Sequence, residues 1–299
     1  MAGPAAAVEL PKYYYRDNFV SLCETVQAQY GDLLSADECE FLARFYMLDH
    51  PAQCLYVRLV SRVGPLFRTA KLDYPELGNL DVPVRDLIDS GLAAPINSLT
   101  VSELGGIFTK AELACSFRDD LNLPAQYRKE HLLEGIEGLK LEPSECFSRI
   151  TLPDEPPVVG IVGTELIERL QLLFFGNSYQ SLTEFILSDL GLARYYPYPL
   201  DRDHRLFLNR DALNEYIACG EFSEAFRELA ELDDTDALVA LAGEMLVQHV
   251  EHESSRRRWQ RGCIRVGREL ERRGELALAL GLYGRCDLHP ANSRRSSGT

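Results

Sequence analysis

Long apolar runs are missing from this sequence. Arg, Asp or Gly interrupts every candidate before it reaches the roughly 18 residues that a membrane-spanning helix requires. The first residues, MAGPAAAVELPKYYYRDN, also lack the charged start and long apolar segment of a secretion signal. No CxxC pair occurs among the eight scattered cysteines. We therefore expect a cytoplasmic protein with no membrane contact, whose cysteines are mostly buried thiols in a reducing compartment.

Patterns typical of catalytic and metal sites are absent as well. The six histidines are dispersed, so none marks a neighbouring cysteine as an activated nucleophile. His249 and His252 are three residues apart, whereas the zinc motif of metalloproteases separates its histidines by four and adds a third ligand. A solvated helix face is the better interpretation of this pair. The sequence alone indicates no catalytic or metal-binding residue.

Positive charge is scarce overall but concentrated locally. The formal net charge is −15, which argues against general nucleic-acid binding because such binding depends on Lys and Arg. Residues 256–299 nevertheless hold eleven arginines against four acidic residues. A second basic cluster comprises Arg58, Arg62, Arg68 and Lys71. Segregated charge of this kind is typical of a protein with discrete contact surfaces.

The composition predicts a mainly α-helical protein of two or three domains. Of 299 residues, 46% are hydrophobic and 26% charged, which excludes a disordered, collagenous or coiled-coil chain. Ser35, Thr100, Thr109 and Ser181 each begin the pattern Ser/Thr-x-x-Glu, in which the hydroxyl and the carboxylate accept hydrogen bonds from backbone amides at a helix start. The pattern predicts helices over 36–48, at 99–141 as a helix-turn-helix unit, and after 181.

Glycine and proline predict where elements end. A helix before 31 is expected to end at Gly31 in the left-handed conformation. A helix over 84–90 is expected to close at Gly91, and one that begins at Thr164 to end at Gly176. Phe67 to Tyr74 is expected to form one arm of a small β wing. Residues 151–163, TLPDEPPVVGIVG, hold three prolines and two glycines, so they are the best candidate for an interdomain linker.

The last third contains a weak internal repeat. The Gly220–Ala225 segment and the Gly274–Ala279 segment share the same five-residue step from Gly to Ala. Around the second copy, small and large residues alternate as in a tetratricopeptide helical hairpin, where small residues let two helices approach. The pattern predicts that Ala279 faces Gly267 across the helix pair.

Taken together, the order of segments resembles the Fanconi-associated nuclease family of structure-selective DNA repair nucleases, which end in a virus-type replication-repair nuclease domain. The bacterial members are the most similar. The resemblance covers most of the chain and is carried by YYYRDNF from Tyr13, CLYVRLVSRVGPLFRTAKLDY from Cys54, LTVSELGGIFTKAEL from Leu99, LQLLFFGNSYQSLTEFILSDLGLARY from Leu170, and RRRWQRGCIRVGRELERRGELALALGLYGRCDLHPA from Arg256.

The resemblance implies four regions. Residues 1–98 would form a helical, winged-helix-like DNA-binding region, and 99–150 a SAP-like DNA-binding module with a helix-turn-helix. Residues 151–215 would form a helical connecting region, and 216–299 tetratricopeptide-like helical hairpins. Such a protein would act near the bacterial nucleoid.

The nuclease domain of the family is expected to be absent from this chain. Members hold Mg²⁺ or Mn²⁺ with acidic residues and a lysine, the last pair written (Asp/Glu)-x-Lys on one strand, where alternate side chains share a face. None of the five lysines has an acidic residue two positions earlier. The resemblance also stops after HPA at 289–291. We expect no cofactor in this chain, and Mg²⁺ or Mn²⁺ only in a full-length family member.

Two functions remain open from the sequence. The first is the DNA-binding and substrate-positioning part of a nuclease for branched or flapped DNA, with a possible contact to its nuclease domain. The second is a protein-interaction scaffold built on helical hairpins. For each basic cluster, a solvated helix face is the alternative to DNA contact, and for residues 256–273 it is the preferred one. The candidate DNA-binding residues are Arg58, Arg62, Arg68, Lys71, Lys110, Tyr127, Arg128 and Lys129.

Overall fold

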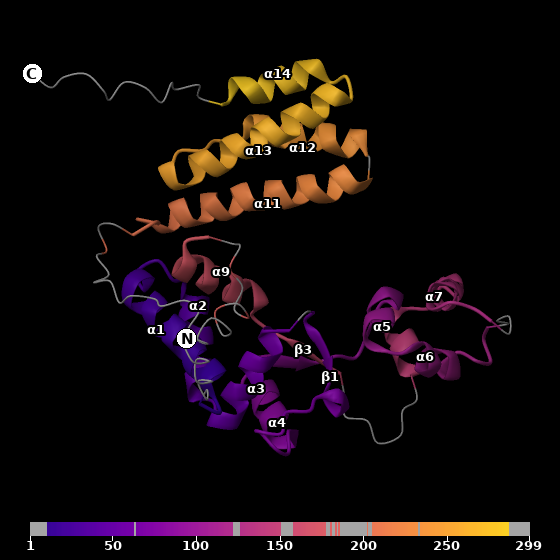
Figure 1. The fold of residues 1–299 in the computed structure, drawn as a ribbon. Coiled ribbons are helices and arrows are strands. Elements are labelled where there is room, and N and C mark those ends of the chain that lie inside the picture. The colour runs from indigo at the N-terminus through magenta and orange to yellow at the C-terminus, as the bar shows by residue number, and fades with distance from the viewer. Residues whose placement is uncertain are drawn as a thin grey trace, which may run out of the picture. The chain divides into compact units, whose positions relative to one another are not determined.

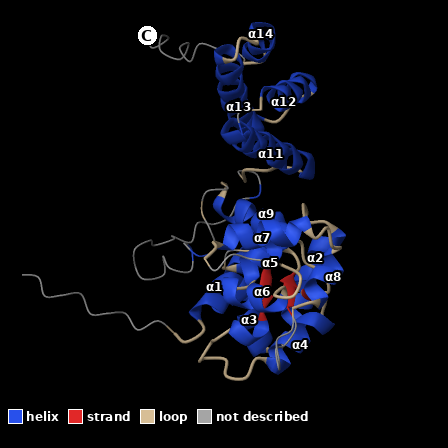
Figure 2. Ribbon diagram, turned by 90° about the vertical axis from the view of Figure 1, so that its right-hand side faces the viewer, coloured by secondary structure: helices blue, strands red, loops and turns tan. Residues whose placement is uncertain are grey.

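The computed structural model describes residues 11–62, 64–121, 126–150, 158–177, 180, 183, 185, 202, 205–232 and 234–286. The chain divides into two compact units, residues 1–198 and 199–299. Helices make up most of both units (Figure 1). Within the described residues, strands occur only in the first unit, where they are short (Figure 2). The predicted mainly α-helical class is confirmed.

Three helices begin the first unit: α1 (Tyr14–Tyr30), α2 (Ala36–Met47) and α3 (His50–Val60). They pack through aromatic side chains, and the ring of Phe45 lies 5.0 Å from that of Phe19 and 5.8 Å from that of Tyr56. The capping box predicted at Ser35 is present. The expectation for Gly31 is wrong, because its φ of −57° is right-handed and its amide simply continues the helical pattern to Gln27.

A small antiparallel sheet follows. The strands β1 (Leu66–Arg68), β2 (Ala93–Pro95) and β3 (Val158–Ile161) lie in the order β1-β3-β2. The 3₁₀ helix η1 (Thr69–Lys71) and the helix α4 (Asp81–Asp89) lie between β1 and β2 in the sequence. The predicted wing arm is confirmed in part, because β1 covers only the start of 67–74. The expected linker over 151–163 is wrong for its second half, because β3 is the buried central strand.

Residues 99–150, here called the helical module, contain α5 (Val101–Ile107), α6 (Lys110–Ser116), α7 (Lys129–Gly138) and α8 (Pro143–Ser148). The predicted capping boxes at Thr100 and Thr109 are both present. The module has its own apolar core, which includes Phe117 and Ile136 and extends to Val158 of β3. Burial of these side chains packs the module against the sheet.

The helix α9 (Thr164–Phe175) follows β3 in the first unit. It ends at Gly176 as predicted, with a φ of +68° that glycine adopts without strain. Its Arg169 forms an ion pair with Glu38 of α2, which joins two helices far apart in the sequence. Most of the box predicted at Ser181, including Ser181 and Glu184, lies outside the described residues.

The second unit consists of α11 (Arg210–Leu232), α12 (Thr235–Val247), α13 (Glu253–Arg272) and α14 (Leu276–Gly284). Gly274 makes the turn between α13 and α14 with a φ of +89°. Gly220, its counterpart in the predicted repeat, lies inside α11 rather than at a turn, and the expected boundary between 215 and 216 also falls within this helix. Ala279 is buried as predicted, but Gly267 faces the ring of Tyr283.

No described helix is both long enough and apolar enough to cross a lipid bilayer.

Candidate nucleic-acid interface

The helical module brings three of the candidate residues together at the starts of α6 and α7. The exposed ammonium of Lys110, the first residue of α6, donates a hydrogen bond to the backbone carbonyl of Tyr127. It also lies 4.1 Å from the centre of the Tyr127 ring, a cation–π contact. Arg128 follows Tyr127 and immediately precedes α7. Two positive charges therefore share one edge of the module.

The start of α7 can accept an anion. Its N-cap residue is Arg128, and no side chain caps the first amides, whereas Thr100 and Thr109 cap α5 and α6. Uncapped amides at a helix start bind phosphate oxygens readily. Arg128 is exposed, and no hydrogen bond or ion pair of its guanidinium to another described residue is found. Its guanidinium is therefore open to a ligand.

Lys129 has a different role. Its ammonium donates hydrogen bonds to the carbonyls of Gly105 and Phe108, the latter at 2.7 Å. These carbonyls lie at the end of α5, where a helix presents unpaired acceptors and partial negative charge. Lys129 therefore ties α7 to α5, and only its neighbour Arg128 faces outward.

Arg68, Lys71 and Glu112 form a charged cluster between the sheet and the module. The guanidinium of Arg68, at the end of β1, lies 2.9 Å from the Glu112 carboxylate of α6. The Lys71 ammonium lies 3.1 Å from the same carboxylate. The Arg68 side chain is only 6% exposed, and its guanidinium carbon lies 4.7 Å from the centre of the Phe108 ring. Arg68 is thus an internal residue, whereas Lys71 remains exposed.

The two arginines near the end of α3 are both engaged by other side chains. Arg58 pairs with Glu76 at 2.5 Å and covers the Tyr15 ring at 4.0 Å. Arg62 lies beyond the last residue of α3, is exposed, and donates a hydrogen bond to the Tyr74 hydroxyl at 3.2 Å. The structure therefore does not bring Arg58, Arg62, Arg68 and Lys71 together as one row of free cations.

The acidic partners stay ionised at neutral pH. Burial raises the pKa of Glu112, but the Thr109 amide and hydroxyl and the cations Arg68 and Lys71 outweigh that effect and lower this pKa to about 2. For Glu76, burial acts in the same direction and is outweighed by a backbone hydrogen bond and by Arg58, so the net pKa is lowered. These carboxylates hold the basic side chains in place.

Sequence reasoning missed the structural importance of Glu112 and Glu76. The capping pattern places Glu112 in the first turn of α6, yet nothing local points to Arg68, which is 44 residues away. Glu76 carries no recognisable pattern, because it lies in a loop 18 residues from Arg58. Both pairs arise from tertiary packing.

The helix α13 presents a basic face and an apolar face. Trp259, Cys263, Val266 and Leu270 are buried in the core of the second unit. On the outer side, exposed arginines follow one another at intervals of about one turn: Arg257, Arg261, Arg265, Arg268 and Arg272. Exposure alone does not separate a solvated face from a contact surface, so the solvated face stays a prediction.

The cysteines fit the expectation of structural thiols in most cases. Five are buried, Cys286 is half-buried, and Cys39 and Cys115 are exposed. Cys54 lies 3.7 Å from the Nδ1 atom of His50, which resembles a catalytic pair. Burial raises the pKa of the Cys54 thiol, so the reactive thiolate is disfavoured. Among the described residues, no cluster of His, Cys, Asp and Glu has a metal-binding arrangement.

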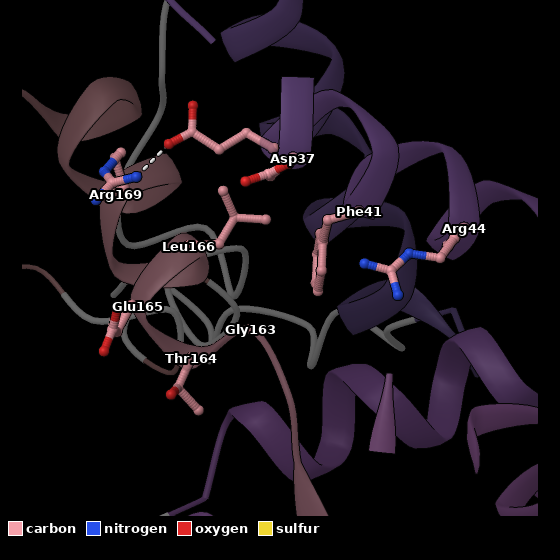
Figure 3. Close-up of a pocket in the computed structure, with 9 residues that line it drawn as sticks. Asp37, Phe41, Arg44, Gly163, Thr164, Glu165, Leu166 and Arg169 are labelled. Carbon is pink, nitrogen blue, oxygen red and sulfur yellow. Dashed lines mark hydrogen bonds and ion pairs between the residues drawn. The ribbon is translucent and has the colours of Figure 1, made fainter. Parts of the chain in front are cut away.

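A hollow of about 320 Å³ lies between α2 and α9. Figure 3 shows Arg169 and Arg44 on opposite sides of it, with Leu166 and Phe41 between them. Arg169 is paired with Glu38, and Arg44 donates a hydrogen bond to the carbonyl of Ser90. Arg169 and Arg44 therefore join secondary-structure elements on either side of this hollow.

Comparisons with known proteins agree with this architecture. A family model described as "FAN1, HTH domain" matches residues 13–94. A Fanconi-associated nuclease 1 homolog of Pseudomonas aeruginosa is 35% identical over 215 residues, which is 72% of this chain and 38% of the relative. A homolog of Arabidopsis thaliana is 26% identical over 75% of this chain and 26% of the relative.

Solved structures show the same relationship. The crystal structure of paFAN1 bound to 5′ flap DNA with a two-nucleotide flap and a gap has a TM-score of 0.77 and 30% identity. The similarity covers 95% of this chain and 50% of that one. The chain thus spans half or less of the length of these similar proteins. From the order of its elements, its matching segments and these similarities, the chain belongs to the Fanconi-associated nuclease family and aligns with the N-terminal part of its members.

Proposed function

We propose that this chain is the DNA-binding and substrate-positioning part of a structure-selective repair nuclease that acts on flapped or branched DNA. The observation that carries this proposal is the similarity to a family member bound to 5′ flap DNA, which extends over 95% of the chain at 30% identity. The exposed charges at the starts of α6 and α7 support it chemically, because phosphates bind Lys, Arg and uncapped helix amides.

In this proposal each of the four regions has its own role. Residues 1–98 act as a winged-helix-like region, 99–150 as a SAP-like module, 151–215 as a connecting region and 216–299 as tetratricopeptide-like hairpins. Duplex DNA is contacted by Arg62, Lys71, Lys110 and Arg128, with Tyr127 supporting Lys110. Arg58, Arg68 and Lys129 are half-buried or buried and are paired, so they support the fold in this proposal and do not contact DNA.

Phosphodiester cleavage with Mg²⁺ or Mn²⁺ is assigned to the part of the family's length that this chain does not span. The sequence offers no (Asp/Glu)-x-Lys pair for it. A second candidate function is a protein-interaction scaffold. It is favoured by the outer face of α14, where Leu276 and Leu280 are 57% and 70% exposed, and by the net charge of −15.

The experiment that separates the two functions measures affinity for a 5′ flap duplex by fluorescence anisotropy over a range of salt concentrations. The test variant is Lys110→Ala with Arg128→Ala. The control is Arg118→Ala with Lys140→Ala, which removes two exposed charges from the opposite ends of α6 and α7. Circular dichroism checks that both variants are folded.

If Lys110 and Arg128 each neutralise one phosphate, the slope of log affinity against log salt becomes shallower by roughly 1.8 in the test variant. The control slope stays that of the parent. Absence of salt-dependent binding by the parent chain favours the scaffold function. Equal slopes in the two double variants would show that DNA is not contacted at the starts of α6 and α7.

A further inference from the structure

The helical module and the sheet are joined at two kinds of contact. The first is apolar, because Leu66 of β1 and Val158 of β3 belong to the same core as Leu104 and Phe108 of the module. The second is the charged cluster of Arg68, Lys71 and Glu112. An apolar contact permits small rotations, whereas an ion pair with directed hydrogen bonds fixes an orientation.

Glu112 is the centre of this cluster. One of its carboxylate oxygens accepts hydrogen bonds from the amide and the hydroxyl of Thr109, which caps α6. The other accepts from Arg68 at 2.9 Å and lies 3.1 Å from the Lys71 ammonium. A single side chain therefore ties the start of α6 to β1 and η1.

The start of α6 is also where the candidate DNA contacts lie. Lys110 is two residues before Glu112, and its ammonium reaches Tyr127 next to Arg128. On the other side of the cluster, Lys71 is exposed. Any change in how Glu112 holds Arg68 would move Lys110 and Arg128 relative to Lys71.

We propose that Glu112 is a positioning residue that sets the helical module on the sheet, so that Lys71, Lys110 and Arg128 contact one duplex together. This inference rests on the proposed DNA-binding function and adds to it the residue that aligns the contacts. Glu112 itself repels phosphate, so its contribution to DNA binding is made through Arg68 and Lys71. Arg68, buried and stacked on Phe108, is the fixed end of this connection.

The electrostatic role and the positioning role of Glu112 predict opposite changes in DNA affinity for Glu112→Gln. Removing a negative charge beside phosphate-binding residues should strengthen binding if only electrostatics matters. A change in the alignment of Lys71, Lys110 and Arg128 should weaken DNA binding. Glutamine still completes a capping box, so α6 keeps its cap. Glu103→Gln is the matched control, because Glu103 has the same capping contacts with Thr100 in α5 and no ion pair with the sheet is found for it among the described residues.

The test measures the affinity of the whole chain for the 5′ flap duplex and its salt dependence. We expect Glu112→Gln to bind five- to tenfold more weakly, with a slope shallower by roughly 0.9 for each phosphate that the variant no longer neutralises. Glu103→Gln should bind as tightly as the parent or more tightly. A partly unfolded variant would lower the active fraction without changing the slope, so slope and amplitude together separate alignment from misfolding.

A second variant restores packing without charge. Arg68→Met with Glu112→Met replaces the pair by apolar side chains, which often maintain packing at such sites. Because these side chains supply no directed hydrogen bonds, we expect this variant to bind about as weakly as Glu112→Gln. Binding by Glu112→Gln that equals or exceeds that of the parent overturns the positioning role, as does a double variant that binds as tightly as the parent. Failure of the parent chain to bind DNA overturns the proposed function itself.

Discussion

The ammonium of Lys129 lies 2.7 Å from the carbonyl oxygen of Phe108, the C-cap residue of α5. Its neighbour Arg128 is exposed, and the Arg128 side chain accepts no hydrogen bond from the first amides of α7. Two adjacent cations in the sequence thus have separate roles, one inside the module and one at its surface. A sequence pattern that counts basic residues cannot distinguish them, but a pair of variants can.

Lys129→Met should destabilise the first unit by about 1–2 kcal/mol, because the carbonyls of Gly105 and Phe108 lose a charged donor. Arg128→Ala should change stability by no more than about 0.5 kcal/mol, as is usual for an exposed residue. Urea unfolding followed by circular dichroism measures both. A Lys129→Met midpoint equal to that of the parent would show that these hydrogen bonds do not stabilise the module.

The pKa of Glu112 gives a prediction for acid conditions. Its folded-state value of about 2 lies below the ordinary 4.5, so the ionised carboxylate stabilises the fold fully above about pH 4.5. That contribution is lost as the pH falls toward 2. The difference in unfolding free energy between the parent and Glu112→Gln should therefore be smaller at pH 3 than at pH 7. An equal difference at both pH values would contradict the ion-pair assignment.

The absence of an (Asp/Glu)-x-Lys pair predicts that the 299-residue chain does not cut DNA. Incubation with 5′ flap or single-stranded DNA and Mg²⁺ or Mn²⁺ should leave the strands intact on a denaturing gel. A family member with its nuclease domain serves as the positive control. Metal-dependent cleavage that a point change within this chain abolishes would reveal a catalytic site that its sequence patterns do not mark.

Local signals in the sequence were sufficient for much of the fold. Ser35, Thr100 and Thr109 begin helices as predicted, because a capping box needs only residues within one turn. The strand at 158–161 was not predictable from its neighbours. Its partners are Leu66–Arg68 and Ala93–Pro95, and adjacent prolines and glycines indicate a linker when that pairing is unknown.

In the candidate interface, too, local features were predictable from the sequence and contacts between distant residues were not. Basic residues at helix starts were recognised from the sequence, because the ends of helices have local signals. Which of them face outward depends on distant carboxylates and carbonyls, such as Glu112 for Arg68. Packing between distant segments also decided the hairpin, where the Tyr283 ring lies nearest to Gly267.

Two glycines of α13 should respond differently to alanine. A Cβ on Gly267 would lie 2.5 Å from the Tyr283 ring, whereas one on Gly262 would have only ordinary contacts, the nearest at 3.6 Å. Gly262→Ala should leave stability unchanged or raise it by up to about 1 kcal/mol through helix propensity. Gly267→Ala should destabilise the second unit by about 1 kcal/mol or more. Equal unfolding midpoints for the two variants would contradict the close packing of Tyr283 on α13.

The hairpin offers a sharper comparison on α14. Ala279 is 2% exposed and packs in the core of the second unit, whereas Ala277, two residues earlier, is exposed. Leucine at 279 must displace its neighbours or leave its preferred rotamers, which typically costs about 1–3 kcal/mol. Leucine at 277 adds the same atoms with the same helix propensity and meets solvent, so its effect should stay within roughly 0.5 kcal/mol.

Denaturant unfolding of the two alanine-to-leucine variants measures this difference, provided that residues 199–299, a compact unit, unfold in one transition. The Ala279→Leu midpoint should fall and its slope should stay that of the parent, because the surface exposed on unfolding barely changes. A lower midpoint for Ala277→Leu would mean that the outer face of α14 is covered in solution. If instead both variants unfold like the parent, Ala279 is not packed against α12 and α13, and the hairpin arrangement of the second unit is wrong.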